Sequence, residues 1–259
     1  MKPLASIVPA LAQPATLTET EHRPWPVPRR PWLMAQTWEN LLFAHWRVPE
    51  AELRRVVPPE LAIDTHEGGA WIGVTPFEVS ALRLRGLPHV PRLTSFPEVN
   101  VRTYVTVDGR PGIYFLSLDA ASRAAVAAAR RTYRLPYFKS RMAARRTGER
   151  VDYRSERISD DGLPAQLRVV YGPTGGPSKA AEGSIEQFLA ERYCLYTLDG
   201  RRRVVYADIH HPPWPLQRAT ASFGENTMTG PLSIDLAAAG DPLLHFAARQ
   251  DVLIWGPER

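Results

Sequence analysis

Apolar and polar residues alternate with a period of two along several stretches of the chain, as in strands that bury one face. The alternation is clear in residues 70–84 and again in residues 99–107. Asp108-Gly109, directly after the second stretch, is a typical hairpin turn. Residues 112–118 would then return as the partner strand. The pattern therefore predicts neighbouring antiparallel strands in this half of the chain.

The long apolar and aromatic run at residues 34–48 predicts a central strand, and Pro76 predicts a bulge or an edge position in the strand at 70–84. Residues 119–133 are rich in alanine and are predicted to form a helix, with Asp119 or Ser122 as its N-cap. A second, short helix is predicted at residues 184–192, where Ser184 begins a capping box.

The remaining chain adds more hairpins. Further strands are predicted at residues 134–146, 149–158, 193–198 and 203–209. Regularly spaced hairpins with few helices predict an α+β fold, in which an antiparallel-rich closed β-barrel carries short peripheral helices. We expect a single barrel domain over residues 31–259, preceded by a disordered, proline-rich extension at residues 1–30.

Composition agrees with a folded domain, because 44% of the 259 residues are hydrophobic. No stretch approaches the roughly 18 to 20 apolar residues that cross a bilayer, so we expect no membrane association. The only cysteine, Cys194, suits a reducing compartment, and we expect a cytoplasmic protein. The first residues, MKPLASIVPALA, resemble a signal peptide only faintly, since Pro9 breaks a short apolar run.

The formal net charge of +5 makes nucleic-acid binding one alternative. Acidic residues are interleaved with the basic ones, however, so a solvated surface is the expected explanation and no nucleic-acid partner is expected. The 32 basic residues include only three lysines, which are Lys2, Lys139 and Lys179. Because arginine stays protonated and forms no Schiff base, chemistry that needs an amine has very few candidates.

One strand carries an unusual row of polar side chains. Asn100, Arg102 and Tyr104 alternate with valine and threonine, and Glu98 joins the row if the strand begins early enough. A face with these groups does not pack against an apolar core. It faces either solvent or a polar cavity, and the alternation alone leaves both open.

The sequence contains no recognisable metal-binding or cofactor-binding motif. The seven histidines lack the spacing of a zinc site, and no nucleotide-binding glycine motif is present. We therefore expect no metal and no cofactor. His45 lies in an apolar context and is kept as a ligand-binding candidate. The face of its strand that would line a cavity is left open by the alternation.

Several segments together resemble the uncharacterised YqjF-like family (DUF2071), a branch of the acetoacetate decarboxylase-like superfamily. The segments are QTWENLLFAHWRV, FPEVNVRTYV, GIYFLSLDAAS, ARRTYRLPYFKSRM, FLAERYCLY, HHPPWPL and LLHFAARQDVLIWG. They extend from about residue 34 almost to the end of the chain. The resemblance implies a closed barrel around a cavity. It places Glu98 at the position of a cavity glutamate and Arg130 at that of an arginine of the decarboxylases.

The resemblance also reveals a departure. In the decarboxylases a lysine that forms an imine with the substrate follows a proline, whereas here Pro136 is followed by Tyr137. Lys139 shares the expected face of Tyr137 and could act as a displaced nucleophile. The alternative, which we favour, is that Lys139 points to solvent, since burying an unpaired ammonium group is costly.

Two functional hypotheses follow. In the first, a cavity binds a small organic acid or keto compound without an imine, through Asn100, Arg102, Tyr104, Arg130 and His45. In the second, the protein is a lysine-independent lyase or hydratase, with Glu98 as the acid or base and Tyr137 as a proton donor or oxyanion stabiliser. A homo-oligomer is compatible with either hypothesis.

Overall fold

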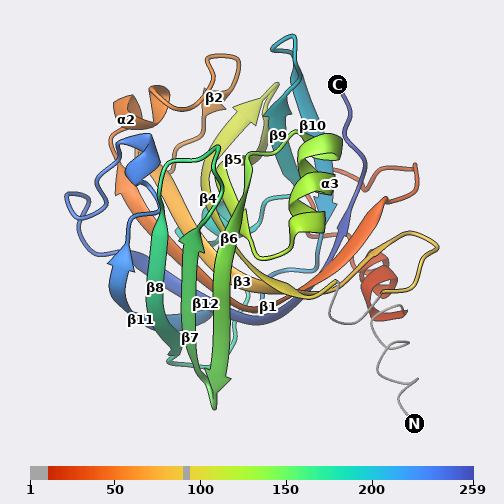
Figure 1. Ribbon diagram of the computed structural model, residues 1–259. Coiled ribbons are helices and arrows are strands. Elements are labelled where there is room, and N and C mark those ends of the chain that lie inside the picture. Colours follow the sequence, from red (N-terminus) through yellow and green to blue (C-terminus); the bar gives the residue numbers. More distant parts are fainter. Residues whose placement is uncertain (1–10, 90–93) are drawn as a thin grey trace.

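The computed structural model describes residues 11–89 and 94–259, and these form a strongly curved β-sheet with a few short helices (Figure 1). The strands are β1 (Met34–Val48), β2 (Ala62–Ile63), β3 (Ala70–Leu84), β4 (Phe96–Val107), β5 (Arg110–Ala120), β6 (Tyr137–Thr147), β7 (Arg150–Arg157), β8 (Gln166–Pro173), β9 (Cys194–Leu198), β10 (Val204–His210), β11 (Gln217–Asn226) and β12 (Leu243–Ile254). The helical elements are η1 (Thr16–Thr18), α2 (Glu50–Arg54), α3 (Arg123–Tyr133), α4 (Ile185–Ala190) and η2 (Gly230–Leu232).

A single 12-stranded sheet contains these strands in the order β10-β9-β5-β6-β7-β8-β11-β12-β1-β3-β4-β2. Additional pairings join β4 to β5 and β10 to β12, so the sheet bends back onto itself. Among the described strands, β5 makes the parallel pairings, with β6 and β9, and the other pairings are antiparallel. The predicted α+β fold, antiparallel-rich with a few short helices, is confirmed at this level.

Local sequence explains where two of the elements begin. Asp108 and Gly109 both have positive φ, at 50° and 74°, as the tight turn between β4 and β5 requires. The Ser122 side chain accepts a hydrogen bond from the Ala125 amide at 3.2 Å and caps α3. The helix therefore begins at Arg123, later than predicted, because Asp119 still belongs to β5.

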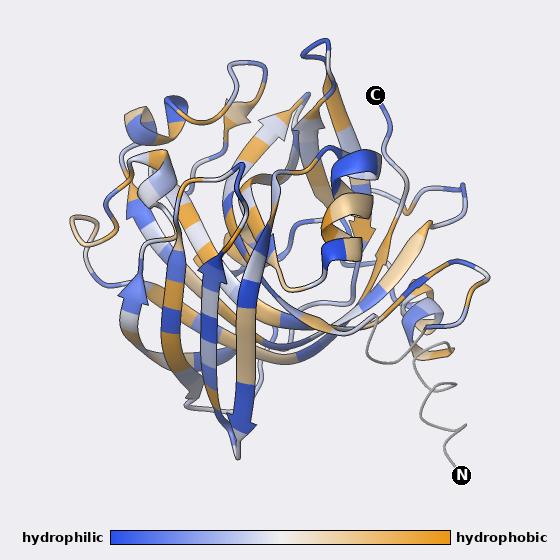
Figure 2. Cartoon of the chain, in the orientation of Figure 1, coloured by the Kyte–Doolittle hydropathy of each residue, from blue (hydrophilic) through white to orange (hydrophobic). Residues whose placement is uncertain are grey.

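Strands β1, β3 and β4 are buried on both faces. On β4, Val99, Val101 and Val105 join the main apolar cluster, which also contains Tyr153 of β7 and Tyr171 of β8. Strands β6, β7 and β8 form an outer layer, and along β7 and β8 hydrophobic and hydrophilic residues alternate (Figure 2). The opposite face of β4, with its polar row, is therefore turned away from this core.

The segment at residues 11–30 differs from the predicted disordered extension, because it lies against the sheet. Gln13 is buried, and its amide donates hydrogen bonds to Thr37 Oγ1 and the Ala81 carbonyl, both at 3.2 Å. Arg23 is also buried and donates to the Ile209 carbonyl at 2.6 Å. These polar contacts hold a segment that has little apolar periodicity. The predicted disorder of residues 1–10 lies outside the described residues.

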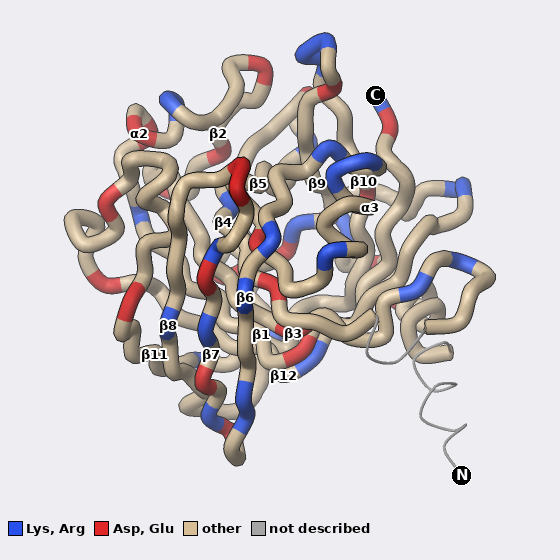
Figure 3. The backbone as a smooth tube through the Cα atoms, in the orientation of Figure 1, with Lys and Arg blue, Asp and Glu red and all other residues tan. Residues whose placement is uncertain are grey.

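Charged residues of both signs are spread over the chain (Figure 3). Several basic side chains are paired, such as Arg202 with Glu60 at 2.8 Å and Arg141 with Glu156 at 2.9 Å. Within the described part of the chain, no helix is both long enough and apolar enough to span a bilayer.

Candidate functional site

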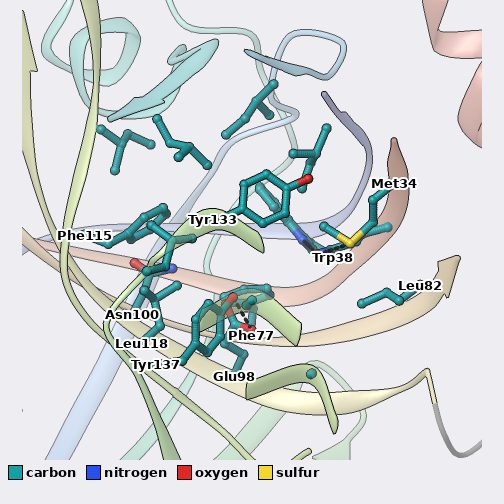
Figure 4. A pocket seen from close by; sticks show the side chains of 18 of the residues that line it. Met34, Trp38, Phe77, Leu82, Glu98, Asn100, Phe115, Leu118, Tyr133 and Tyr137 are labelled. Carbon is teal, nitrogen blue, oxygen red and sulfur yellow. Dashed lines mark hydrogen bonds between the residues drawn. The ribbon is translucent and has the colours of Figure 1, made fainter. Parts of the chain in front are cut away.

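A cavity of about 440 Å³ lies on the concave side of the sheet, next to α3 (Figure 4). Its walls are predominantly apolar and come from β1, β3, β4, β5, α3 and the segments around β9 and β10. The alanine-rich face of α3 leaves room where larger side chains would fill the space. The polar lining residues include Gln36, Thr75, Glu98, Asn100, Arg102, Tyr137, Arg192 and His211.

A bulge in β1 decides which of its side chains reach the cavity. Trp38 and Leu41 both line it, although strict alternation would turn them to opposite faces. Between them Asn40 has a φ of 52°, and the β1–β3 register shifts between Glu39 and Ala44. Met34, Gln36 and Trp38 thus line the cavity before Asn40, and Leu41 lines it after the bulge has shifted the alternation by one residue.

Pro76 lies opposite this bulge. It pairs with Val99 of β4, while the β1–β3 ladder is interrupted beside it. A proline has no amide hydrogen to donate, so it is tolerated where the ladder is broken. The structure therefore confirms a bulge beside Pro76 within a central strand.

Strand register gives the cavity a polar end and an apolar end. Arg102 pairs with Gly73, and Glu98 pairs with Phe77 further along the same two strands. Further still, Met34 of β1 pairs with Leu84 at the other end of β3. Leu84 lines the cavity and yet is 46% exposed, whereas Arg102 is 5% exposed. The Arg102 side chain is therefore buried, whereas the lining residue Leu84 at the other end reaches the surface.

Glu98 and Tyr137 meet in the cavity wall. The Tyr137 hydroxyl lies 3.2 Å from both carboxyl oxygens of Glu98 (Figure 4). Burial raises the pKa of Glu98 to about 8, and the negative charge of nearby Asp119 acts in the same direction. Burial and the neighbouring Glu98 also raise the pKa of Tyr137 well above its usual value. At neutral pH the pair is therefore a carboxylic acid beside a neutral phenol.

Arg102 brings a positive charge into the cavity wall. Its guanidinium lies over the rings of Phe43 and Tyr104, 5.0 Å and 5.9 Å from their centroids. One nitrogen donates to the Leu189 carbonyl at 3.4 Å, and Nε is buried without a partner among the described residues. No ion pair joins Arg102 to an acidic residue of the described chain. A buried charge of this kind is costly unless a partner is supplied.

His45 and Tyr104 lie behind this guanidinium. The Tyr104 hydroxyl donates to the Leu189 carbonyl at 2.9 Å, so His45 Nε2, 2.7 Å away, must carry the hydrogen of their shared bond. Burial, followed by the positive charge of Arg102, lowers the pKa of His45 well below its usual value. A Cβ at Gly73 would lie 2.7 Å from the His45 ring, so glycine makes room for the imidazole.

Other polar atoms around the cavity also lack partners. Thr75 Oγ1, Asn100 Oδ1 and Trp214 Nε1 are buried without a hydrogen bond to the described residues. All three residues line the cavity. Buried polar groups normally find a partner, so these atoms mark positions where a bound molecule or water would be hydrogen-bonded.

The predicted site residues fall into three groups. Glu98, Asn100, Arg102 and Tyr137 line the cavity together. Tyr104 and His45 are buried behind Arg102 and support it without being part of the lining.

Lys139 and Arg130, the two remaining candidates, are not among the lining residues. The Lys139 ammonium group donates to the Ala121 carbonyl. Arg130 donates to the Tyr137 carbonyl at 2.6 Å and pairs with Asp161 at 2.8 Å. A ligand role for either residue stays a prediction.

Sequence reasoning missed Thr75, Trp214 and Arg192. Arg192 lines the cavity but is paired with Asp64 at 2.6 Å. Trp214 belongs to the quoted segment HHPPWPL, which indicated the family but not the direction of the side chain. Among the described residues, no three His, Cys, Asp or Glu side chains gather as they would around a metal ion.

Solved structures with the same fold come from the acetoacetate decarboxylase-like class. An acetoacetate decarboxylase superposes with a TM-score of 0.60 at 12% identity, covering 94% of this chain and 96% of the other. The enduracididine biosynthesis enzyme MppR, solved in complex with pyruvate, gives 0.59 at 13% identity and covers 92% of both chains. An acetoacetate decarboxylase-like enzyme from Sphingomonas wittichii RW1 gives 0.57 at 12% identity, covering 92% and 96%. The fold is therefore acetoacetate decarboxylase-like.

The chain belongs to the DUF2071 family, described as an uncharacterized conserved protein, whose profile matches residues 35–251. The uncharacterized protein YqjF of Bacillus subtilis (strain 168) is 47% identical over 229 residues, which are 88% of this chain and 93% of YqjF. The family resemblance inferred from the seven sequence segments is confirmed.

Proposed function

We propose that this protein is a closed β-barrel that binds a small organic carboxylate or keto acid in its cavity, with the carboxylate paired to Arg102. The observation that carries the proposal is the buried guanidinium on the cavity wall, which has no acidic partner among the described residues. A planar guanidinium and a carboxylate match in geometry as well as in charge.

The other orphaned polar atoms support the same ligand class. Asn100 is two residues from Arg102 on β4, and Thr75 of β3 pairs with Asn100. Because Glu98 has a pKa of about 8, its neutral carboxyl group can donate a hydrogen bond to a keto or carboxylate oxygen without repelling it. The solved complex of MppR with pyruvate is a precedent in this fold class.

The proposed binding involves no imine. Of the described lysines, Lys139 donates to the Ala121 carbonyl and Lys179 pairs with Glu19 at 3.3 Å. Neither is among the residues that line the cavity. The ligand would therefore be held by charge and hydrogen bonds rather than by a covalent bond.

Calorimetric titration with a panel of small carboxylates, including pyruvate, tests the proposal. Arg102→Met should weaken binding at least about 30-fold, because a desolvated charge partner is removed. Arg145→Met, on the exposed part of β6, is the matched control and should bind like the unmodified protein. If no acid binds, or if Arg102→Met binds as tightly, the proposal is wrong.

A second candidate function is a lysine-independent lyase or hydratase. The raised pKa of Glu98 favours it, because an acid that is still protonated at neutral pH can deliver a proton to a bound ligand. Tyr137, which is hydrogen-bonded to it, would stabilise a developing negative oxygen. Turnover of a bound acid, followed by NMR and lost in Glu98→Gln, would support this function. Ligands recovered unchanged would indicate that the protein binds the acid without catalysing a reaction.

A further inference from the structure

The cavity extends much further than its polar end. Along β4, Glu98 is the last polar side chain that lines the cavity. Beyond it, the paired strands β1 and β3 contribute Trp38, which pairs with Val79, and then Met34, which pairs with Leu84. Met34 and Leu82 lie on the opposite side of the cavity from Asn100 and Phe115 (Figure 4). A molecule whose carboxylate lies at Arg102 therefore has a predominantly apolar passage between its head and the exposed end, in which Gln36 is a polar exception that accepts a hydrogen bond from Trp38 Nε1.

The volume agrees with a ligand of more than a few atoms. At about 440 Å³, the cavity falls within the range of roughly 300–1,000 Å³ that is usual for drug-sized ligands. A keto acid of three or four carbons would occupy the polar end and leave the apolar walls uncovered. The faces of Trp38, Phe77 and Phe96 that line the cavity, together with the alanine face of α3, would then remain uncovered by ligand.

We infer that the ligand is an amphipathic carboxylic acid, with an apolar chain or ring of about six to ten carbons, bound with its carboxylate inward. This inference rests on the proposed function and specifies its ligand class. The carboxylate pairs with Arg102, and Asn100, two residues away on β4, contacts the oxygens of the head. The tail then runs past the neutral Glu98 along Phe77, Trp38 and Leu82. The half-exposed Leu33 and Leu84 mark the opening through which the acid enters.

Calorimetric titration with straight-chain acids from butanoate to decanoate tests the tail. Each methylene that becomes buried should tighten binding about fourfold, until the chain reaches the opening. Octanol, which has the tail without the charge, should bind far more weakly than octanoate. Quenching of Trp38 and Trp214, which both line the cavity, gives an independent signal of where the acid binds.

A matched pair of variants on α3 localises the tail. Ala129 is half-buried and lines the cavity, whereas Ala127 is exposed and does not. Leucine is nearly as good a helix former as alanine, so both substitutions should leave α3 intact. Ala129→Leu should weaken octanoate binding about tenfold and leave butanoate binding nearly unchanged, since only the longer tail loses buried surface. Ala127→Leu should alter neither affinity.

The outcomes separate this inference from the proposed function. If butanoate and octanoate bind equally tightly and both depend on Arg102, the proposed function stands and the apolar tail is wrong. If affinity rises with chain length but Ala129→Leu has no effect, the tail does not lie where we place it and the inference is overturned. If no acid binds in an Arg102-dependent way, or octanol matches octanoate, both proposals fail.

Discussion

Replacing Glu98 with glutamine is the sharpest test of the cavity's electrostatics. Burial raises the pKa of the Glu98 carboxyl group from 4.5 to about 8. The folded protein therefore binds this proton more tightly than the unfolded chain does. Each pKa unit corresponds to about 1.4 kcal/mol, so ionising Glu98 costs roughly 5 kcal/mol of folding stability.

The direction of the pH dependence follows from proton linkage. Below pH 4.5 the carboxyl group is neutral in both states, and Glu98 adds no pH dependence. Between pH 4.5 and about 8 the unfolded chain has released the proton while the folded protein keeps it, so stability falls as pH rises. Glutamine is neutral throughout and can still accept the hydrogen bond from Tyr137. The variant should therefore gain stability relative to the unmodified protein across this window.

Urea unfolding at several pH values measures the difference directly. The free energy of unfolding of Glu98→Gln minus that of the unmodified protein should grow by a few kcal/mol between pH 5 and pH 8. Other titrating groups, including the buried His45, cancel in this difference. Glu182→Gln, in an exposed loop, is the control and should show no such growth. A flat difference for Glu98→Gln would mean that Glu98 is already ionised at neutral pH, and the electrostatics described above would be wrong.

Three further substitutions test the architecture, each by the free energy of unfolding. Gly73→Ala should cost about 1–3 kcal/mol, because the new Cβ lies 2.7 Å from the buried His45 ring, and an unchanged stability would contradict this packing. Arg157→Met should cost about 3–5 kcal/mol, because it strands Asp119, which Arg157 contacts at 2.7 Å within the core. Gln13→Ala should cost about 1–3 kcal/mol if residues 11–30 are fixed against the sheet as described. A loss below about 0.5 kcal/mol would instead support the predicted disordered extension.

Much of the fold could be predicted, because strand alternation and turn residues are local signals. Asp108-Gly109 indicated the hairpin, and of the two expected helix caps, Asp119 and Ser122, the structure uses Ser122. The ordered contacts of Gln13 could not be predicted in the same way. They depend on hydrogen bonds to residues far along the sequence, and a polar, proline-rich segment gives no periodic signal for such contacts.

Alternation located the candidate site on one strand, and the family resemblance added Tyr137 at the start of β6. Glu98, Asn100 and Arg102 share a parity on β4, so a single observation placed them on one face. On β1 the bulge at Asn40 exchanges the two faces midway, and alternation could not show which side chains would reach the cavity. Arg130 and Lys139 were candidates by resemblance and position, but neither is among the residues that line the cavity; Arg130 pairs with Asp161, and Lys139 donates to the Ala121 carbonyl.

The two ionisable groups of β4 have complementary consequences for a bound acid. Both residues line the same cavity, so an ionised Glu98 would repel the charge of a bound anion. Because burial keeps Glu98 neutral at physiological pH, the positive charge of Arg102 has no acidic partner among the described residues that line the cavity. An acid that binds as an anion pairs with the guanidinium, and this attraction offsets the cost of burying the positive charge. Above pH 8, where Glu98 ionises, the same acid should bind more weakly, so the affinity for anions is tied to the protonation state of one buried carboxyl group.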